Sequence, residues 1–141
     1  MLNPAEHPDE MKRLEALREL EPIGTGSDPL FDDLTLLAQK ICKAPISLMG
    51  FVDHDRQWNK SARGLDIRDI PRPVSFCAHT ILRPGIFEIR DARKDADFHD
   101  HPWVIDGPRI RFYAGVPVFS RSGLPVGSLC VMDSEPGHLD P

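Results

Sequence analysis

The sequence predicts an α+β fold in which helices cover an antiparallel sheet built from hairpins. The clearest indication is a pair of apolar, β-prone runs, Ile110–Phe119 and Leu124–Met132, joined by the short polar connection Ser120–Gly123, as in a β-hairpin. The first run is apolar on both alternating faces, so its strand must be covered from both sides. Two helical patterns near the N-terminus provide such cover.

Two helices are expected in the first third of the chain, after residues 1–7, which are expected to be disordered or an extension of a neighbouring segment. The first begins at Pro8, and breaks at Pro22, Gly24 and Gly26 end it. Ser27-Asp28-Pro29 then caps a second helix, Pro29–Lys43. The first carries a narrow apolar stripe, Met11, Leu14, Leu17 and Leu20. The second carries a wide apolar face expected to pack on the sheet: Leu30, Leu34, Leu37, Ala38 and Ile41.

Short strands and loops follow these helices. The expected elements are a strand at Ile46–Val52, a returning strand at Gln57–Ala62, an irregular loop at Gly64–Pro73, a short helix at Ser75–Leu82, a strand at Ile86–Ile89 and a helical turn near Asp97–Val104. Pro117 conflicts with a central strand, because proline donates no ladder hydrogen bond. We therefore expect that end of the strand to be bulged, or Pro117 to lie beyond the paired part of the strand.

Composition restricts the class of protein. With 141 residues, 40% hydrophobic and 28% charged, the chain has the size and composition of one domain, expected over residues 8–141. A net charge of −5 argues against a nucleic-acid partner, since such proteins present a basic surface. No apolar stretch approaches the roughly 20 residues that cross a bilayer, and the polar N-terminus is unlike a signal peptide. The expected location is the cytoplasm, without membrane attachment.

Three segments carry side chains with chemical potential, and each has an ordinary structural explanation. Cys77 and His79 are two positions apart on a short helix, so they point in different directions and form no catalytic pair. The acidic and histidine-rich run Asp95–His101 has no further metal ligand elsewhere, which favours a solvated loop over a metal site. Trp58, beside a turn, lines a ligand cavity or closes the edge of the core. No catalytic or metal-ligating residues are assigned.

The three cysteines, Cys42, Cys77 and Cys130, lack the Cys-x-x-Cys spacing of metal and redox motifs. Each lies within an apolar run, where a reduced, buried cysteine is the usual state. They predict neither a disulfide framework nor a zinc site.

An ordered series of short motifs runs along the chain. Its members are Phe31-Asp32-x-Leu34-Thr35, Pro45-Ile46-Ser47-Leu48, Val52-Asp53-x-x-Arg56-Gln57-Trp58, Ser75-Phe76-Cys77-Ala78-His79-Thr80-Ile81, Asp91-Ala92, Ile110-Arg111-Phe112-Tyr113-Ala114-Gly115-x-Pro117 and Gly127-Ser128-Leu129-Cys130-Val131-Met132-Asp133. Together they resemble a GAF domain of the type found in bacterial sensor histidine kinases and diguanylate cyclases. The resemblance covers about residues 8–133.

The resemblance implies a central antiparallel sheet of about six strands with helices on its faces, and a pocket between the sheet and the central segment. It also implies a non-catalytic sensory domain of a two-component system or similar signalling protein. Such a domain binds a small molecule, dimerises, or does both, and controls an output domain in cis or a partner kinase by a population shift. The family's closing C-terminal helix is missing, so we expect a fragment of a larger sensor or a module without its transmitter.

The resemblance assigns no cofactor, which stays unknown. Asn59-Lys60 and Phe87-x-x-x-Asp91 match part of the cyclic-nucleotide pattern, but Ala92 replaces its glutamate. Bilin attachment in the family needs a cysteine directly followed by histidine, whereas Ala78 separates the two here. Asn59 also stands where relatives carry an aromatic residue.

The expected pocket is roofed by residues 63–82 and floored by the sheet. Its candidate lining residues are Phe51, Trp58, Phe76, Cys77, His79, Arg111 and Tyr113. Arg111 would pair with an anionic ligand or, in the alternative, brace a turn. Two rival interpretations remain open. One is a structural homodimerisation module without a ligand, joined through the stripe of the first helix. The other is a redox enzyme that depends on a reactive Cys77.

Overall fold

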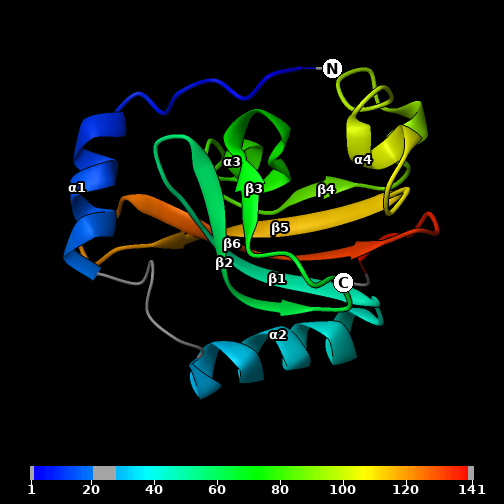
Figure 1. Cartoon of the computed structure of the whole chain (residues 1–141), viewed down its shortest axis with the longest axis horizontal. Coiled ribbons are helices and arrows are strands. Elements are labelled where there is room, and N and C mark those ends of the chain that lie inside the picture. The colour runs from blue at the N-terminus through cyan, green and yellow to red at the C-terminus, as the bar shows by residue number, and fades with distance from the viewer. Residues whose placement is uncertain (1, 21–27, 140–141) are drawn as a thin grey trace.

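The computed structural model describes residues 2–20 and 28–139, and in it helices lie on both faces of an antiparallel sheet (Figure 1). The helices are α1 (Glu10–Leu20), α2 (Pro29–Cys42), α3 (Phe76–Thr80) and α4 (Pro102–Ile105), with 3-10 turns η1 (Arg72–Val74) and η2 (Ala92–Lys94). The strands are β1 (Ile46–Val52), β2 (Arg56–Arg63), β3 (Asp69–Pro71), β4 (Phe87–Ile89), β5 (Phe112–Phe119) and β6 (Pro125–Asp133).

The six strands pair in the order β3-β2-β1-β6-β5-β4, and every neighbouring pair is antiparallel. Helices α1 and α2 contact one side of the sheet, here called the helix face, which includes Met49 and Phe51. Helices α3 and α4 lie on the other side, here called the cavity face, which includes Leu48 and Cys130 (Figure 1). The predicted α+β class and its antiparallel six-stranded sheet are confirmed.

The sequence analysis did not predict one of the six strands. Asp69–Pro71, inside the expected irregular loop, forms the edge strand β3 and pairs with the start of β2. Three residues that end in proline contain too little alternation to show the periodicity of a strand. The helical turn expected near residues 97–104 is α4, which begins later, at Pro102.

The N-terminal part is described only in pieces. Residues 2–7 form neither helix nor strand, and the Leu2 N–H donates to the Asp97 carbonyl at 3.0 Å. The break predicted at Pro22, Gly24 and Gly26 lies outside the described residues, as does Ser27. Asp28 caps α2 by accepting from the Leu30 N–H at 2.9 Å.

The prediction that α2 turns its apolar face to the sheet is wrong. Leu30, Leu37 and Ile41 are 63%, 54% and 69% exposed, whereas Thr35 is fully buried. Polar groups on β2 explain this orientation. The Ser61 hydroxyl donates to the Asp32 carboxylate at 2.6 Å, and the Arg63 guanidinium donates to the Thr35 hydroxyl at 3.1 Å.

Helix α1 uses its predicted stripe only in part. Leu17 is buried in a cluster with Phe51 and Val126, but Met11 is 80% exposed. Arg13, which the stripe does not include, is fully buried on the same side as Leu17.

Pro117 lies within the paired region of β5, opposite Ser128 of β6. Strand β4 pairs with Tyr113–Gly115, so among the described residues no strand flanks β5 on that side at Pro117. The register of β5 and β6 shifts between Val118 and Phe119. Proline is therefore accommodated where one ladder has ended and before an irregularity. The expected irregularity at that end of the strand is confirmed, whereas Pro117 itself lies within the paired region.

Candidate functional site

A small enclosed cavity of about 10 Å³ lies between the cavity face of the sheet and α3. Strands β1, β2, β3, β5 and β6 contribute residues to its floor, whereas η1, α3 and α4 contribute residues to its roof. It is lined by Leu48, Gln57, Ile70, Val74, Phe76, Cys77, Trp103, Tyr113, Cys130 and Met132. Such a volume is at the lower limit for a single water molecule, so this conformation is closed.

Stacked aromatic rings hold the roof on the sheet. The Phe76 ring of α3 stacks on Tyr113 of β5 and on Phe98, each with centroids 5.0 Å apart. The His79 ring meets Phe98 edge-on at 4.8 Å. Burial lowers the pKa of His79 to about 4, so the ring is neutral at physiological pH and behaves as part of this aromatic cluster.

A chain of buried hydrogen bonds joins α3 to β2. The Ser75 hydroxyl caps α3 by accepting from the Ala78 N–H at 3.0 Å, and it donates to the Gln57 side-chain oxygen at 2.6 Å. The Gln57 amide donates to Asn59 at 2.8 Å, which in turn donates to the Ile67 carbonyl at 2.9 Å. Buried polar groups that are fully paired in this way fix one arrangement of the roof.

A second polar group lies deeper, between α3 and the central strands. The Tyr113 hydroxyl lies 2.6 Å from the Thr80 hydroxyl and donates to the Cys77 sulfur at 3.6 Å. The Cys77 and Cys130 sulfurs are 3.9 Å apart. The Ser128 hydroxyl, two residues from Cys130 on the same strand, is buried with no hydrogen-bond partner among the described residues.

Two glycines leave room for these polar side chains. A Cβ at Gly50 would lie 2.5 Å from the Gln57 amide nitrogen and 2.8 Å from the Asn59 side-chain oxygen. A Cβ at Gly115 would lie 2.5 Å from the Tyr113 hydroxyl. Glycine within a strand often marks a close approach of this kind, so Gly50 was the available sequence signal for Gln57 and Asn59, which the sequence analysis did not include among the candidates.

The structure brings three of the seven sequence-derived candidates together around the cavity, namely Phe76, Cys77 and Tyr113. His79 lies behind them against Phe98, outside the lining.

The inclusion of Phe51 and Trp58 in the pocket needs correction. Phe51 packs on the helix face, where its ring meets that of Phe31 edge-on at 6.0 Å. Trp58 is its cross-strand neighbour and therefore shares that face. Arg111 also lies away from the cavity and braces a turn by donating to the Val104 carbonyl at 2.8 Å.

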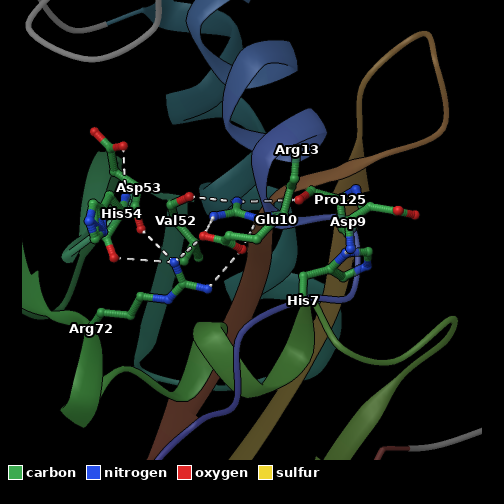
Figure 2. A network of polar contacts seen from close by, with 9 residues as sticks. All are labelled: His7, Asp9, Glu10, Arg13, Val52, Asp53, His54, Arg72 and Pro125. Carbon is green, nitrogen blue, oxygen red and sulfur yellow. Dashed lines mark hydrogen bonds and ion pairs between the residues drawn. The ribbon is translucent and has the colours of Figure 1, made fainter.

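A buried ion cluster connects the roof with α1 (Figure 2). The Glu10 carboxylate accepts from the Arg13 Nε at 2.9 Å and from the Arg72 Nη1 at 2.5 Å. The Arg13 guanidinium also donates to the Val52 carbonyl at 2.6 Å, and the Arg72 guanidinium donates to the Asp53 carbonyl at 3.1 Å. Despite the opposing effect of burial, hydrogen bonds from the two guanidinium groups lower the pKa of Glu10 to about 2. The first turn of α1 is thus bonded to the start of the roof.

The run Asp95–His101 serves the fold. His101 caps α4 by accepting from the Trp103 N–H at 3.0 Å, and its other ring nitrogen lies 3.0 Å from the Val74 carbonyl of the roof. Within residues 2–20 and 28–139, no three histidine, cysteine or acidic side chains are grouped as metal ligands would be.

A second depression, of about 190 Å³, lies on the helix face between α2 and strands β5 and β6. Its lining is almost entirely apolar and includes Ala38, Ile86, Val116, Leu129 and Leu139. Small-molecule sites usually combine apolar walls with a few polar groups that orient the ligand. Polar side chains, among them Gln57 and Tyr113, surround the cavity beneath α3, whereas the residues that line the depression have apolar side chains.

The comparisons with known proteins agree with this architecture. The GAF domain family matches residues 18–141. The chain belongs to this family. A cyclic di-GMP phosphodiesterase from Pseudomonas aeruginosa is 44% identical over 136 residues, which are 96% of this chain and 23% of that protein. The chain thus spans about a quarter of the length of this curated relative.

Solved structures share the fold at low sequence identity. The GAF domain of an Acinetobacter phosphoenolpyruvate-protein phosphotransferase is 17% identical, with a TM-score of 0.63 and coverage of 92% of this chain and 81% of that one. A type II free methionine-R-sulfoxide reductase from Thermoplasma acidophilum is 15% identical, with a TM-score of 0.63 and coverage of 88% and 82%. None of the described helices has the length and apolar character that a membrane crossing requires.

Proposed function

We propose that this chain is a non-catalytic regulatory GAF domain of a bacterial signalling protein, in which a small molecule bound beneath α3 controls an output domain. The observation that carries the proposal is the set of polar side chains around the cavity. Gln57, Tyr113 and the two thiols belong to residues that surround it, and the nearby Ser128 hydroxyl has no hydrogen-bond partner among the described residues. Groups of this kind would orient a small polar ligand.

Binding would require the roof to move, because about 10 Å³ is smaller than any organic ligand. A ligand that prefers an open conformation would shift the population toward it by its difference in affinity. Arg72 belongs to the roof and shares the Glu10 carboxylate with Arg13, so opening would alter the contacts of α1 (Figure 2). Helix α1 is therefore our proposed route to the output domain.

The output domain is proposed from the relatives. The 44% identical protein is a cyclic di-GMP phosphodiesterase, which supports control of cyclic di-GMP turnover in cis. The motif series supports the alternative outputs, a histidine kinase of a two-component system or a diguanylate cyclase. The proposal includes a cytoplasmic location, which the three free cysteines support because disulfides are rare in that compartment.

Native mass spectrometry of the purified protein, compared with its denatured mass, tests ligand binding. We expect a non-covalent mass that disappears on denaturation and is reduced in both Gln57→Leu and Tyr113→Phe. Trp58→Phe, on the opposite face of the sheet, is the matched control and should retain that mass. A bare protein, or a mass that both cavity variants retain in full, would contradict a ligand in this cavity.

A second proposed function is homodimerisation through the exposed side of α2. Leu30, Leu34, Leu37 and Ile41 follow spacings of four, three and four residues, which is the spacing of a coiled-coil seam. Exposed Asp33 and Lys40 lie beside this seam, and an antiparallel pairing of two copies would place each Asp33 opposite Lys40 of the second copy. This charge complementarity favours a second copy as the occupant.

Sedimentation at two protein concentrations tests this dimer. We expect Asp33→Lys and Lys40→Asp each to weaken association, because like charges would then face each other across the seam. The double variant, which exchanges the charges, should restore association. A strict monomer at both concentrations would eliminate the dimer, whatever the outcome of the ligand experiment.

A further inference from the structure

The fold brings together two thiols that are 53 positions apart in the sequence (130 − 77). Cys77 lies on α3, in the roof, and Cys130 lies in β6, in the floor. Their sulfur atoms are 3.9 Å apart, and each residue is only 2% exposed. Cys42, the third cysteine, lies on α2 on the other side of the sheet.

The surroundings of the pair favour a thiolate on Cys77. The contact with the Cys130 thiol lowers the pKa of Cys77, although burial opposes this, and the Tyr113 hydroxyl also donates to the Cys77 sulfur. The same contact raises the pKa of Cys130. Cys77 is thus the better nucleophile, and Cys130 is the thiol available to resolve an oxidised Cys77.

We propose that Cys77 and Cys130 are a redox site that forms a reversible disulfide when a small hydroperoxide enters beneath α3. The Cys77 thiolate attacks the peroxide, so that an O–O bond breaks and the sulfenic acid and an alcohol, or water, are formed. Cys130 then attacks that sulfur, the S–S bond forms, the S–O bond breaks and water leaves. Overall, two thiols are oxidised and one hydroperoxide is reduced. A dithiol reductant reverses the bond by exchange.

The geometry requires a small displacement. An S–S bond is about 2.05 Å long, so the sulfurs must approach by about 1.9 Å. Helix α3 has only five residues and lies on the sheet through side-chain contacts, so a small shift closes this gap. The bond would join the roof to the floor and hold the cavity shut. Oxidation would therefore oppose the opening that ligand binding requires.

Peptide mapping of the whole chain tests the site. The reduced protein is treated with hydrogen peroxide, alkylated under denaturing conditions, digested and analysed by mass spectrometry without reduction. We expect a Cys77–Cys130 crosslink as the main product in the native protein, and its loss after dithiothreitol. In urea, loop closure favours a crosslink between Cys42 and Cys77, which are only 35 residues apart (77 − 42). A main product at Cys77–Cys130 would therefore show that these two thiols are close together in the folded protein.

Cys42→Ser is the matched control and should keep the crosslink, whereas Cys130→Ser should abolish it and leave an oxidised Cys77. Amide exchange of residues 76–80 should be slower in the oxidised wild-type protein than in the reduced protein. Oxidation confined to Cys42, or a Cys77–Cys130 crosslink that forms only in urea, would overturn the proposal. The mapping uses the wild-type protein without a ligand, so a bare protein in the native mass spectrum leaves this test unaffected.

Discussion

The two faces of the sheet distribute polar and apolar groups in opposite ways. On the cavity face, polar side chains such as Gln57 and Tyr113 lie inside under an aromatic roof. On the helix face, α2 turns Thr35 inward and leaves Leu37 and Ile41 in solvent. The polar groups of the first face are covered within one copy of the chain, whereas the second face leaves apolar side chains of α2 exposed.

This difference shows that hydrogen-bond satisfaction can outweigh amphipathicity in orienting a helix. Ser61 and Arg63 on β2 need partners, and Asp32 and Thr35 of α2 supply them. A buried polar group without a partner costs about 1–3 kcal/mol. Several such costs are comparable to the benefit of burying one more leucine, about 1.5–3 kcal/mol.

The largest effect is expected where the two faces are joined, at Arg13. Arg13→Met removes the bonds to Glu10 and to the Val52 carbonyl, and leaves both acceptors buried. We expect a loss of about 3 kcal/mol in the free energy of unfolding, measured by urea denaturation. Lys12→Met, on the exposed side of α1, is the control and should change it by less than about 0.5 kcal/mol. Equal effects at the two positions would show that the cluster does not stabilise the junction.

A smaller effect is expected beneath the polar network of the cavity face. Gly50→Ala places a methyl group against Gln57 and Asn59 and should cost about 2 kcal/mol. Gly85→Ala meets no atom within 4 Å among the described residues, and it should be nearly neutral. Urea denaturation of both variants measures the difference. Similar stabilities would mean that the two amide side chains can rearrange freely.

The orientation of α2 gives the third prediction. Thr35→Val keeps the volume but removes a hydroxyl that contacts Ser61 and Arg63, so we expect a loss of about 1.5 kcal/mol. Leu37→Gln, at an exposed position, should change the stability of the monomer by less than about 0.5 kcal/mol. Thermal unfolding at low protein concentration compares them. The reverse order of effects would restore the orientation predicted from the apolar periodicity.

The sequence predicted the layered fold well because its signals are local. The run Ile46–Val52 and the hairpin ending at Met132 are dense in β-formers, and Ser75 marks the start of α3 as an N-cap. The edge strand Asp69–Pro71 had no such local pattern. It forms because β2 offers it a free edge, which is a tertiary cause.

The candidate site was predicted less completely, because it depends on register and proximity. Because of a bulge in β2, Asn59 and Ser61 lie on opposite faces of the sheet. Strict alternation counted from Trp58 therefore assigns Ser61 to the wrong face. Cys130 becomes relevant only when α3 lies over β6, which sequence spacing does not reveal. The burial of Gln57 depends on the space left by Gly50 and on the hydrogen bond from Ser75, neither of which the sequence around Gln57 reveals.

The smallest effect expected is a change in pH dependence on the cavity face. The pKa of His79 is about 4 in the folded protein and 6.5 in the reference state, because burial, His101 and Arg83 disfavour its charged form while Asp97 opposes this. As the pH falls through that interval, the unfolded chain takes up a proton that folded His79 does not. The stability from neutral His79 is therefore complete above pH 6.5 and decreases toward pH 4.

His79→Gln should flatten the dependence of the free energy of unfolding on pH between 6.5 and 4.5, while the Glu10 carboxylate loses its contribution at lower pH. The exposed His99 is the control, since His99→Gln should leave the slope unchanged. Urea denaturation at several pH values measures both slopes. An unchanged slope in His79→Gln would show that the roof admits water and charge to His79. The cavity face would then admit solvent to its interior, and the contrast between a closed cavity face and an exposed helix face would no longer hold.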